Sequence, residues 1–166
     1  METAAEPKKR PDFLTILCVL SFIGSSFGIL SGLADYNNAD VKAELSRQMI
    51  EEQKEKALDK AVTAEQKSFM EKMFSGANEL MDTVKVKQNS LFSIMSNILT
   101  LVGALLMFRL KRTGFGIYVL GIGVFIAAPL VIFGPSNIFG LMMTFFLGLL
   151  GVLFVILYSL NLKHMR

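Results

Sequence analysis

The residues most often used in catalysis and metal binding are few in this chain and far apart. Cys18 is the only cysteine, and His164 is the only histidine and lies beside Lys163 and Arg166. A disulfide or a CxxC pair within one chain is therefore impossible, and the sequence also lacks an HExxH motif and a phosphate-binding glycine loop after a strand. We expect His164 to be a solvated side chain at a membrane interface. We predict no catalytic residue, no metal and no other cofactor, so that the protein is not an enzyme.

A group of carboxylates could in principle bind a cation. Its members are Asp35, Asp40, Glu51, Glu52 and Glu55. They are interleaved with lysines, which is typical of a solvated helix face. We therefore predict no metal site among them.

Four apolar stretches determine the class of protein. Each is long enough to cross a hydrocarbon core of about 30 Å, which needs roughly 20 apolar residues. They are residues 13–33, 91–110, 114–133 and 138–160. The first is longer than the core of a cleaved signal peptide, so we expect an uncleaved anchor. A chain that is 52% hydrophobic and only 19% charged also excludes a disordered protein, and the expected fold is all-α with four transmembrane helices.

Ionisable residues are missing from these stretches, apart from Arg109 at an edge. Coupled transport and voltage sensing usually need such a group inside the membrane. We therefore predict that the protein is not a pump, a coupled exporter or a voltage sensor.

The charges predict the orientation. The tail 1–12, the link around 111–113 and the tail 161–166 form one side, which together with Arg109 carries eight basic and three acidic residues. The segment 34–90 carries the remaining nine basic and eleven acidic residues, and the turn 134–137 is uncharged. Basic excess in short loops marks the cytoplasmic side, so both termini are expected there and segment 34–90 outside. The net charge of +3 thus reflects membrane orientation, and we predict no nucleic-acid binding.

The outside segment is predicted to be a helical hairpin. Thr63 and Gln66 form a capping-box pattern that begins its second arm, which could run unbroken from about Ala64 to Leu110 with Gly76 as its weakest point. An apolar stripe on this arm is our candidate partner-binding surface, and packing within the hairpin is the alternative. The stripe comprises Phe69, Met70, Met73, Phe74, Leu80 and Met81.

Small and polar residues within the stretches predict where helices pack. Membrane helices associate through close backbone approach and interhelical hydrogen bonds. The candidate packing residues are Gly24, Gly28, Gly32, Asn97, Thr100, Gly140, Thr144 and Gly148. These faces could form an internal four-helix bundle, bind a foreign helix or make a homodimer.

Two segments carry a family resemblance. Residues 9–18, continuing through 21–25, and residues 111–118 resemble small four-span bacterial inner-membrane proteins of unknown function. The resemblance implies a bacterial cytoplasmic membrane and assigns no functional residue.

These features favour a non-enzymatic role. We expect an accessory or assembly subunit of a larger inner-membrane complex, in protein translocation, secretion or envelope assembly. Its partners would be the lipid bilayer, other integral membrane proteins and an extracytoplasmic protein bound by the hairpin. The alternative is a small homo-oligomeric pore or uncoupled transporter, lined by polar residues such as Ser93, Asn97, Thr100 and Thr144.

Overall fold

The fold is entirely helical in the residues that the computed structural model describes, which are 11–135 and 137–165. These residues form six α-helices and one short 3-10 helix, without a strand. The helices are α1 (Asp12–Asn37), α2 (Ala39–Lys60), α3 (Ala64–Leu80), α4 (Thr83–Phe108), α5 (Thr113–Phe133) and α6 (Ile138–Ser159), followed by η1 (Leu162–His164). Our predictions for residues 1–10, Ser136 and Arg166 lie outside the described residues.

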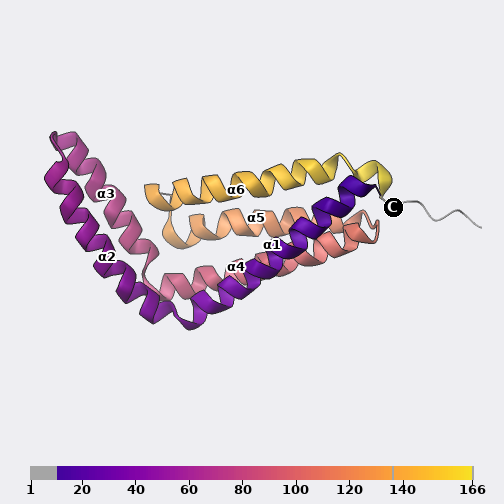
Figure 1. The fold of residues 1–166 in the computed structure, drawn as a ribbon, viewed down its shortest axis with the longest axis horizontal. Coiled ribbons are helices and arrows are strands. Elements are labelled where there is room, and N and C mark those ends of the chain that lie inside the picture. Colours follow the sequence, from indigo (N-terminus) through magenta and orange to yellow (C-terminus); the bar gives the residue numbers. More distant parts are fainter. Residues whose placement is uncertain (1–10, 136, 166) are drawn as a thin grey trace, which may run out of the picture.

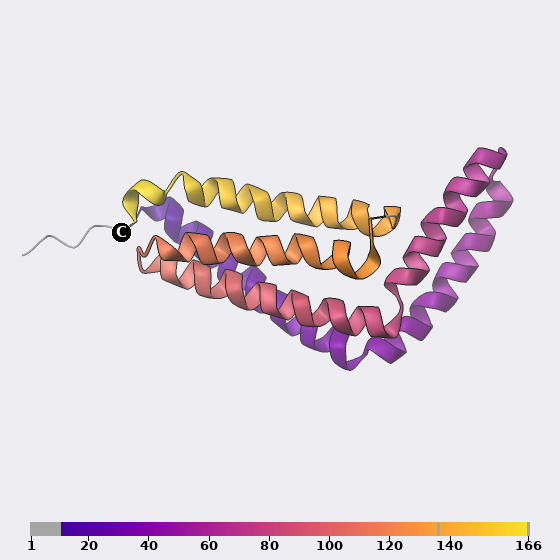
Figure 2. The same ribbon diagram turned by 180° about the vertical axis from the view of Figure 1, so that it is seen from behind.

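Four of these helices, α1, α4, α5 and α6, are long and apolar enough to cross a membrane. The predicted all-α fold, with four membrane-spanning helices and a helical hairpin between the first two, is confirmed. Figures 1 and 2 show the four helices side by side, with the hairpin of α2 and α3 leaning away from one end. The start of α1, the α4–α5 link and the C-terminal residues lie together at the other end, which we call the terminal end.

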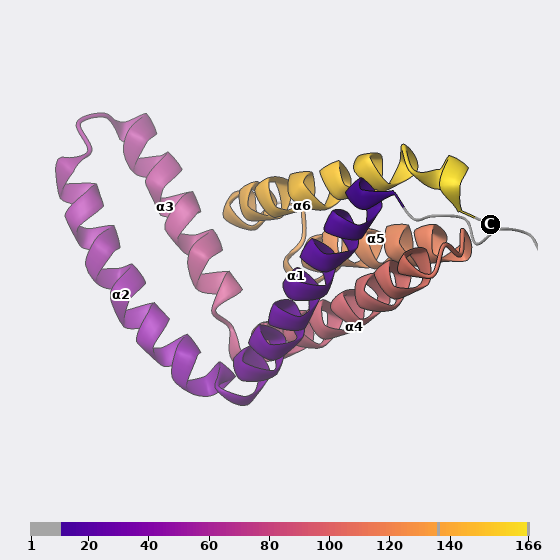
Figure 3. The same ribbon diagram turned by 45° about the vertical axis from the view of Figure 1, so that its right-hand side comes forward.

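The bundle is closed at the terminal end and opens towards the hairpin. A buried cluster at the terminal end joins all four helices, and it includes Leu14, Cys18, Met107, Tyr118 and Tyr158. From there α1 diverges from α6 as it runs towards the hairpin, which is clearest in Figure 3. Helix α4 stays packed along both α1 and α5, so the gap lies between α1 and α6.

The closest backbone contact joins α4 to α5. A Cβ built on Gly103 would lie 2.7 Å from the Tyr118 nitrogen, and one built on Gly114 would lie 2.5 Å from the Gly103 carbonyl oxygen. A Cβ on Gly121 would lie 3.0 Å from the Ser96 carbonyl oxygen. Because lipid supplies no hydrophobic drive for association, this close approach is an important source of packing energy.

The hairpin differs from one of our expectations. The predicted capping box at the start of α3 is confirmed, since the Gln66 amide donates to Thr63 Oγ1 at 3.2 Å and the Thr63 amide donates to Gln66 Oε1 at 3.3 Å. The prediction that one continuous helix could run from Ala64 to Leu110 is wrong. The chain breaks after Leu80, and Asp82 Oδ1 caps α4 by accepting from the amides of Val84 and Lys85, both at 3.1 Å. Gly76, our predicted weak point, lies within α3.

Two glycines in α5 allow a test of the α4–α5 contact. We expect Gly114→Ala to lower the free energy of unfolding by about 1–3 kcal/mol, because its methyl group would meet α4 backbone. Gly116→Ala is the matched control, since nothing lies within 4 Å of a Cβ there, and it should leave stability unchanged or slightly raised. Unfolding of the purified protein by SDS from mild detergent measures both. Equal effects of the two substitutions would refute the close contact.

Candidate functional site

The two arms of the hairpin enclose an apolar groove, which we call the Met/Phe groove. Its α3 wall is formed by Phe69, Met70, Met73, Phe74 and Met81. Met49 and Ile50 of α2 form the facing wall, and Phe139 of α6 closes one side. The groove has a volume of about 590 Å³, which is within the range of ligand and peptide sites.

The groove is covered at its base and open towards the hairpin tip. Ala39 and Ala43 of α2 and Ala77 of α3 are buried near the base. Towards the tip, Phe69 is 54% exposed and Met49 is 56% exposed. The apolar stripe is therefore only partly covered by α2.

Leu80 does not line the Met/Phe groove, although our prediction grouped it with the apolar stripe. The other five candidate partner-binding residues line the Met/Phe groove, and Met81 also reaches the neighbouring cavity. Leu80 lines only that neighbouring cavity, which lies between the hairpin and the bundle. The reason is that α3 ends at Leu80, so its last turn rests on the spans.

Asn137 fixes the hairpin to the bundle. This buried side chain precedes α6, and its Oδ1 accepts from the Gly140 amide at 2.8 Å. Its Nδ2 donates to the Gly76 carbonyl at 3.1 Å and to Glu79 Oε2 at 3.2 Å. A Cβ on Gly76 would lie 2.8 Å from Asn137 Oδ1, so a larger residue there would displace the Asn137 side chain. Sequence reasoning missed this link, although an Asn directly before an apolar helix is a helix-cap signal.

Glu79 extends the same link to α4. Its carboxylate forms an ion pair with Lys85, whose ammonium also lies 5.9 Å from the centre of the Phe133 ring. The hydrogen bond from Lys85 holds the pKa of the Glu79 carboxyl below its ordinary value. Helices α3, α4, α5 and α6 thus meet at Asn137 and Glu79, which positions the base of the Met/Phe groove.

The predicted packing glycines of α1 have different surroundings. A Cβ on Gly28 would collide with the Asn97 side chain, and one on Gly32 would lie 2.7 Å from Ile94. Gly24 is exposed, and nothing lies within 4 Å of a Cβ there. The diverging path of α1 explains this difference, because Gly24 faces the gap between α1 and α6 rather than α4.

In α6 and α4 the predicted polar and small residues mostly contact neighbouring helices. A Cβ on Gly148 would lie 3.2 Å from Ile126 of α5, and Thr100 is hydrogen-bonded to Ser25 of α1 at 2.9 Å. Thr144 donates to the Gly140 carbonyl of its own helix at 2.8 Å, and both line the neighbouring cavity.

Three interhelical hydrogen bonds or contacts were not predicted. Ser96 donates to the Gly121 carbonyl at 2.8 Å, and Ser21 Oγ lies 2.9 Å from Tyr158 Oη. The rings of Tyr118 and Tyr158 pack edge to face with centroids 4.9 Å apart. Only the direction of each helix decides which hydroxyls meet, and no sequence period encodes that direction.

The acidic residues of segment 34–90 are partly paired with lysines. Asp35 pairs with Lys42 at 2.7 Å, Asp40 pairs with Lys87 at 3.1 Å, and Glu52 pairs with Lys56. In the part of the chain that the structure describes, no three His, Cys, Asp or Glu side chains are grouped so that they could hold a metal ion.

Comparisons with known proteins add no relative. No protein-family model matches the chain, and neither curated proteins nor solved structures gave a match. Functional inference therefore depends on the geometry of the groove, the link at Asn137 and the bundle.

Acidification should loosen the hairpin through Glu79. A carboxyl whose pKa is lowered by folding stabilises the fold above its ordinary value of 4.5, and this contribution is lost as the pH falls through the lowered pKa. Because Glu79 is partly exposed, we expect a loss of at most about 1 kcal/mol between about pH 7 and about pH 3. The Glu79→Gln variant should lack this component of the pH dependence. SDS unfolding at both pH values measures it.

Glu52 provides the control for this measurement, since its pair with Lys56 lies on the exposed surface of α2. The Glu52→Gln variant should retain the pH dependence of the unmodified protein. If Glu79→Gln and Glu52→Gln behave alike, the ion pair does not couple the hairpin to the bundle.

Proposed function

We propose that the protein is a non-enzymatic accessory or assembly subunit of a larger membrane complex, with the hairpin as a protein-binding arm. The observation that supports this most directly is the Met/Phe groove, which is apolar, partly exposed and held at the end of the spans. Exposed apolar surfaces of this kind mark interaction sites in membrane and soluble proteins.

An amphipathic helix of an extracytoplasmic protein is the occupant that suits this groove. Two parallel walls of side chains can receive the apolar face of a third helix, as in other helix-in-groove complexes. Methionine is flexible and polarisable, so Met70, Met73 and Met81 can adapt to such a face. The charged residues of α2 and α3 lie in solvent, so the groove is the apolar part of the arm.

We also propose that the membrane is a bacterial cytoplasmic membrane with both termini in the cytoplasm. Arg109, Lys111, Arg112 and Lys163 all follow the terminal ends of spans, where basic residues favour the cytoplasmic side. The hairpin is then extracytoplasmic, and we propose a role in protein translocation, secretion or envelope assembly for it. The sequence resemblance to small four-span inner-membrane proteins agrees with this assignment.

The alternative of a pore lined by polar residues has weaker support. Thr100 is hydrogen-bonded to Ser25, and Asn97 donates to the Ser93 carbonyl at 2.8 Å. The first of these bonds joins α4 to α1 and the second lies within α4, so both side chains already have protein partners, which favours a role in packing.

Photo-cross-linking tests the binding arm. A photoreactive amino acid at Met73, inside the groove, should cross-link to one foreign protein that also co-purifies in stoichiometric amount with the tagged chain. Substituting Phe69, Met73 and Phe74 by Ser should reduce co-purification at least about tenfold, because the partner loses its apolar anchors. The four spans should remain in the membrane.

Val41 and Leu45 supply the controls, since both are exposed apolar residues of α2 outside the groove. A photoreactive residue at Leu45 should give no such product, and Val41→Ser and Leu45→Ser should retain the partner. Cross-links solely between copies of this chain would favour a homo-oligomer over a subunit of a larger complex. Loss of the triple variant from the membrane would show that the stripe is hairpin core.

Single-cysteine labelling tests the orientation. We expect Glu55→Cys on α2 to react with a membrane-impermeant maleimide in intact cells and Arg112→Cys to react only after permeabilisation. The unsubstituted chain is the control, because Cys18 is fully buried. Labelling of position 112 in intact cells would refute the proposed orientation.

A further inference from the structure

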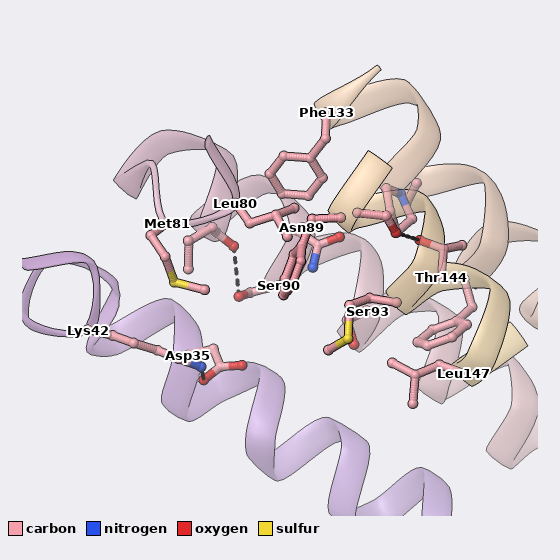
Figure 4. Close-up of a pocket in the computed structure, with 17 residues that line it drawn as sticks. Asp35, Lys42, Leu80, Met81, Asn89, Ser90, Ser93, Phe133, Thr144 and Leu147 are labelled. Carbon is pink, nitrogen blue, oxygen red and sulfur yellow. Dashed lines mark hydrogen bonds and ion pairs between the residues drawn. The ribbon is translucent and has the colours of Figure 1, made fainter. Parts of the chain in front are cut away.

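A second cavity lies where the hairpin joins the spans, and we call it the bundle cleft. It has a volume of about 340 Å³ and is lined by α4, α5 and α6, together with the ends of α1, α2 and α3 that face the spans. Figure 4 shows Asp35 and Lys42 on one side, Thr144 and Leu147 of α6 on the other, and Ser93 of α4 between them. Leu80 and Met81, at the end of α3, lie over the same cavity.

The two walls of the bundle cleft differ in chemistry. The wall formed by α1, α2 and α4 is polar and contains Asp35, Lys42, Asn89, Ser90 and Ser93. The wall formed by α5 and α6 is mostly apolar, with Phe125, Phe133, Met143 and Leu147 among its side chains. A ligand that fits both walls must carry polar groups and hydrocarbon in the same molecule.

The depth of these residues matches the layers of a membrane. Asp35 is in the last turn of α1 and Lys42 is in the first turns of α2, so both lie at the hairpin end of the spans. Phe125 lies eight residues before the end of α5 and Leu147 nine residues after the start of α6, which at 1.5 Å per residue is about 12–14 Å further into the spans. The charged groups therefore lie at headgroup depth, while the deepest side chains lie at acyl-chain depth.

The Asp35–Lys42 ion pair suits a zwitterionic headgroup. The two groups are 2.7 Å apart and nearly half exposed, so each can exchange its partner for a ligand group. Two neighbouring lysines already have other partners, since Lys85 pairs with Glu79 and Lys87 pairs with Asp40. A phosphate could bind Lys42, and a primary ammonium could donate hydrogen bonds to Asp35, which a choline group cannot do.

We propose that the bundle cleft binds one phospholipid with an ethanolamine headgroup. The headgroup pairs with Asp35 and Lys42, and one acyl chain lies along α5 and α6 against Phe125, Met143 and Leu147. A transmembrane helix of a partner is a poorer fit, because a helix with its side chains is about 10–12 Å wide and the cavity is small. The bundle cleft is separate from the Met/Phe groove. The lipid proposal can therefore be tested independently of the proposed protein partner.

The test uses the full chain in nanodiscs of phosphatidylcholine that contain a small share of phosphatidylethanolamine with a photoreactive acyl chain. We expect cross-links to concentrate on Phe125, Met143 or Leu147, and unlabelled phosphatidylethanolamine to compete with them. Unlabelled phosphatidylcholine and phosphatidylglycerol should compete at least about fivefold less well, since neither supplies both a phosphate and a primary ammonium. Mass spectrometry of peptides locates the products.

Two pairs of variants make the result specific. Asp35→Asn and Lys42→Gln should lower cleft cross-linking at least about fivefold, whereas Glu52→Gln and Lys56→Gln, in the exposed pair on α2, should not. Met143→Trp fills the cleft and should also lower cross-linking. Met142→Trp is its matched control, because Met142 is the adjacent residue and is exposed to a similar extent, but it does not line the cleft.

Several outcomes would overturn the proposal. Equal labelling of Met142 and Met143 in the unsubstituted chain would indicate ordinary surrounding lipid. Equal competition by the three lipids would exclude recognition of ethanolamine. A photoreactive amino acid placed at position 143 that cross-links to a second polypeptide instead of to lipid would identify a helix as the occupant. Met143→Trp and Met142→Trp keep the test valid if a charge variant fails to fold.

Discussion

Close backbone contact between α4 and α5 is the interaction on which the rest of the structure depends. In a hydrocarbon environment the backbone must be satisfied within helices, and helices then associate through close packing and polar contacts. Gly103, Gly114 and Gly121 allow the two backbones to approach, and Ser96 adds a hydrogen bond to the Gly121 carbonyl. Helix α1 packs on α4 and α6 packs on α5, so this pair forms the centre of the bundle.

The position of α1 and α6 on this pair explains the two cavities. The helices meet at the terminal end through Ser21 and Tyr158 and diverge towards the hairpin, which leaves the bundle cleft open. The break at Asp82 lets α3 leave the direction of α4, and Asn137 then ties α3 to the start of α6. A straight helix through Asp82 would have carried the Phe and Met stripe away from Phe139, so the break also shapes the Met/Phe groove.

Polar side chains in this protein have different uses at different depths. Within the spans, Ser25, Ser96 and Thr100 hold helices together by hydrogen bonds that do not require charge. At the hairpin end, Asp35, Lys42, Glu79 and Lys85 are charged and partly exposed. This arrangement follows from the cost of burying charge in hydrocarbon, which confines ion pairs to the ends of the spans and makes those ends the places where polar ligands and partners can be recognised.

The sequence by itself determined the all-α fold, the four spans and the capping box at Thr63, because length, apolar runs and helix caps are local properties. It also located most of the α3 wall of the Met/Phe groove, since a helical period puts those residues on one face. Only the tertiary structure decided that Gly24 faces a gap, that Leu80 belongs to the bundle cleft and that Asn137 holds Gly76. These outcomes depend on the direction in which each helix leaves its neighbour, and that direction is set by contacts between residues far apart in the chain.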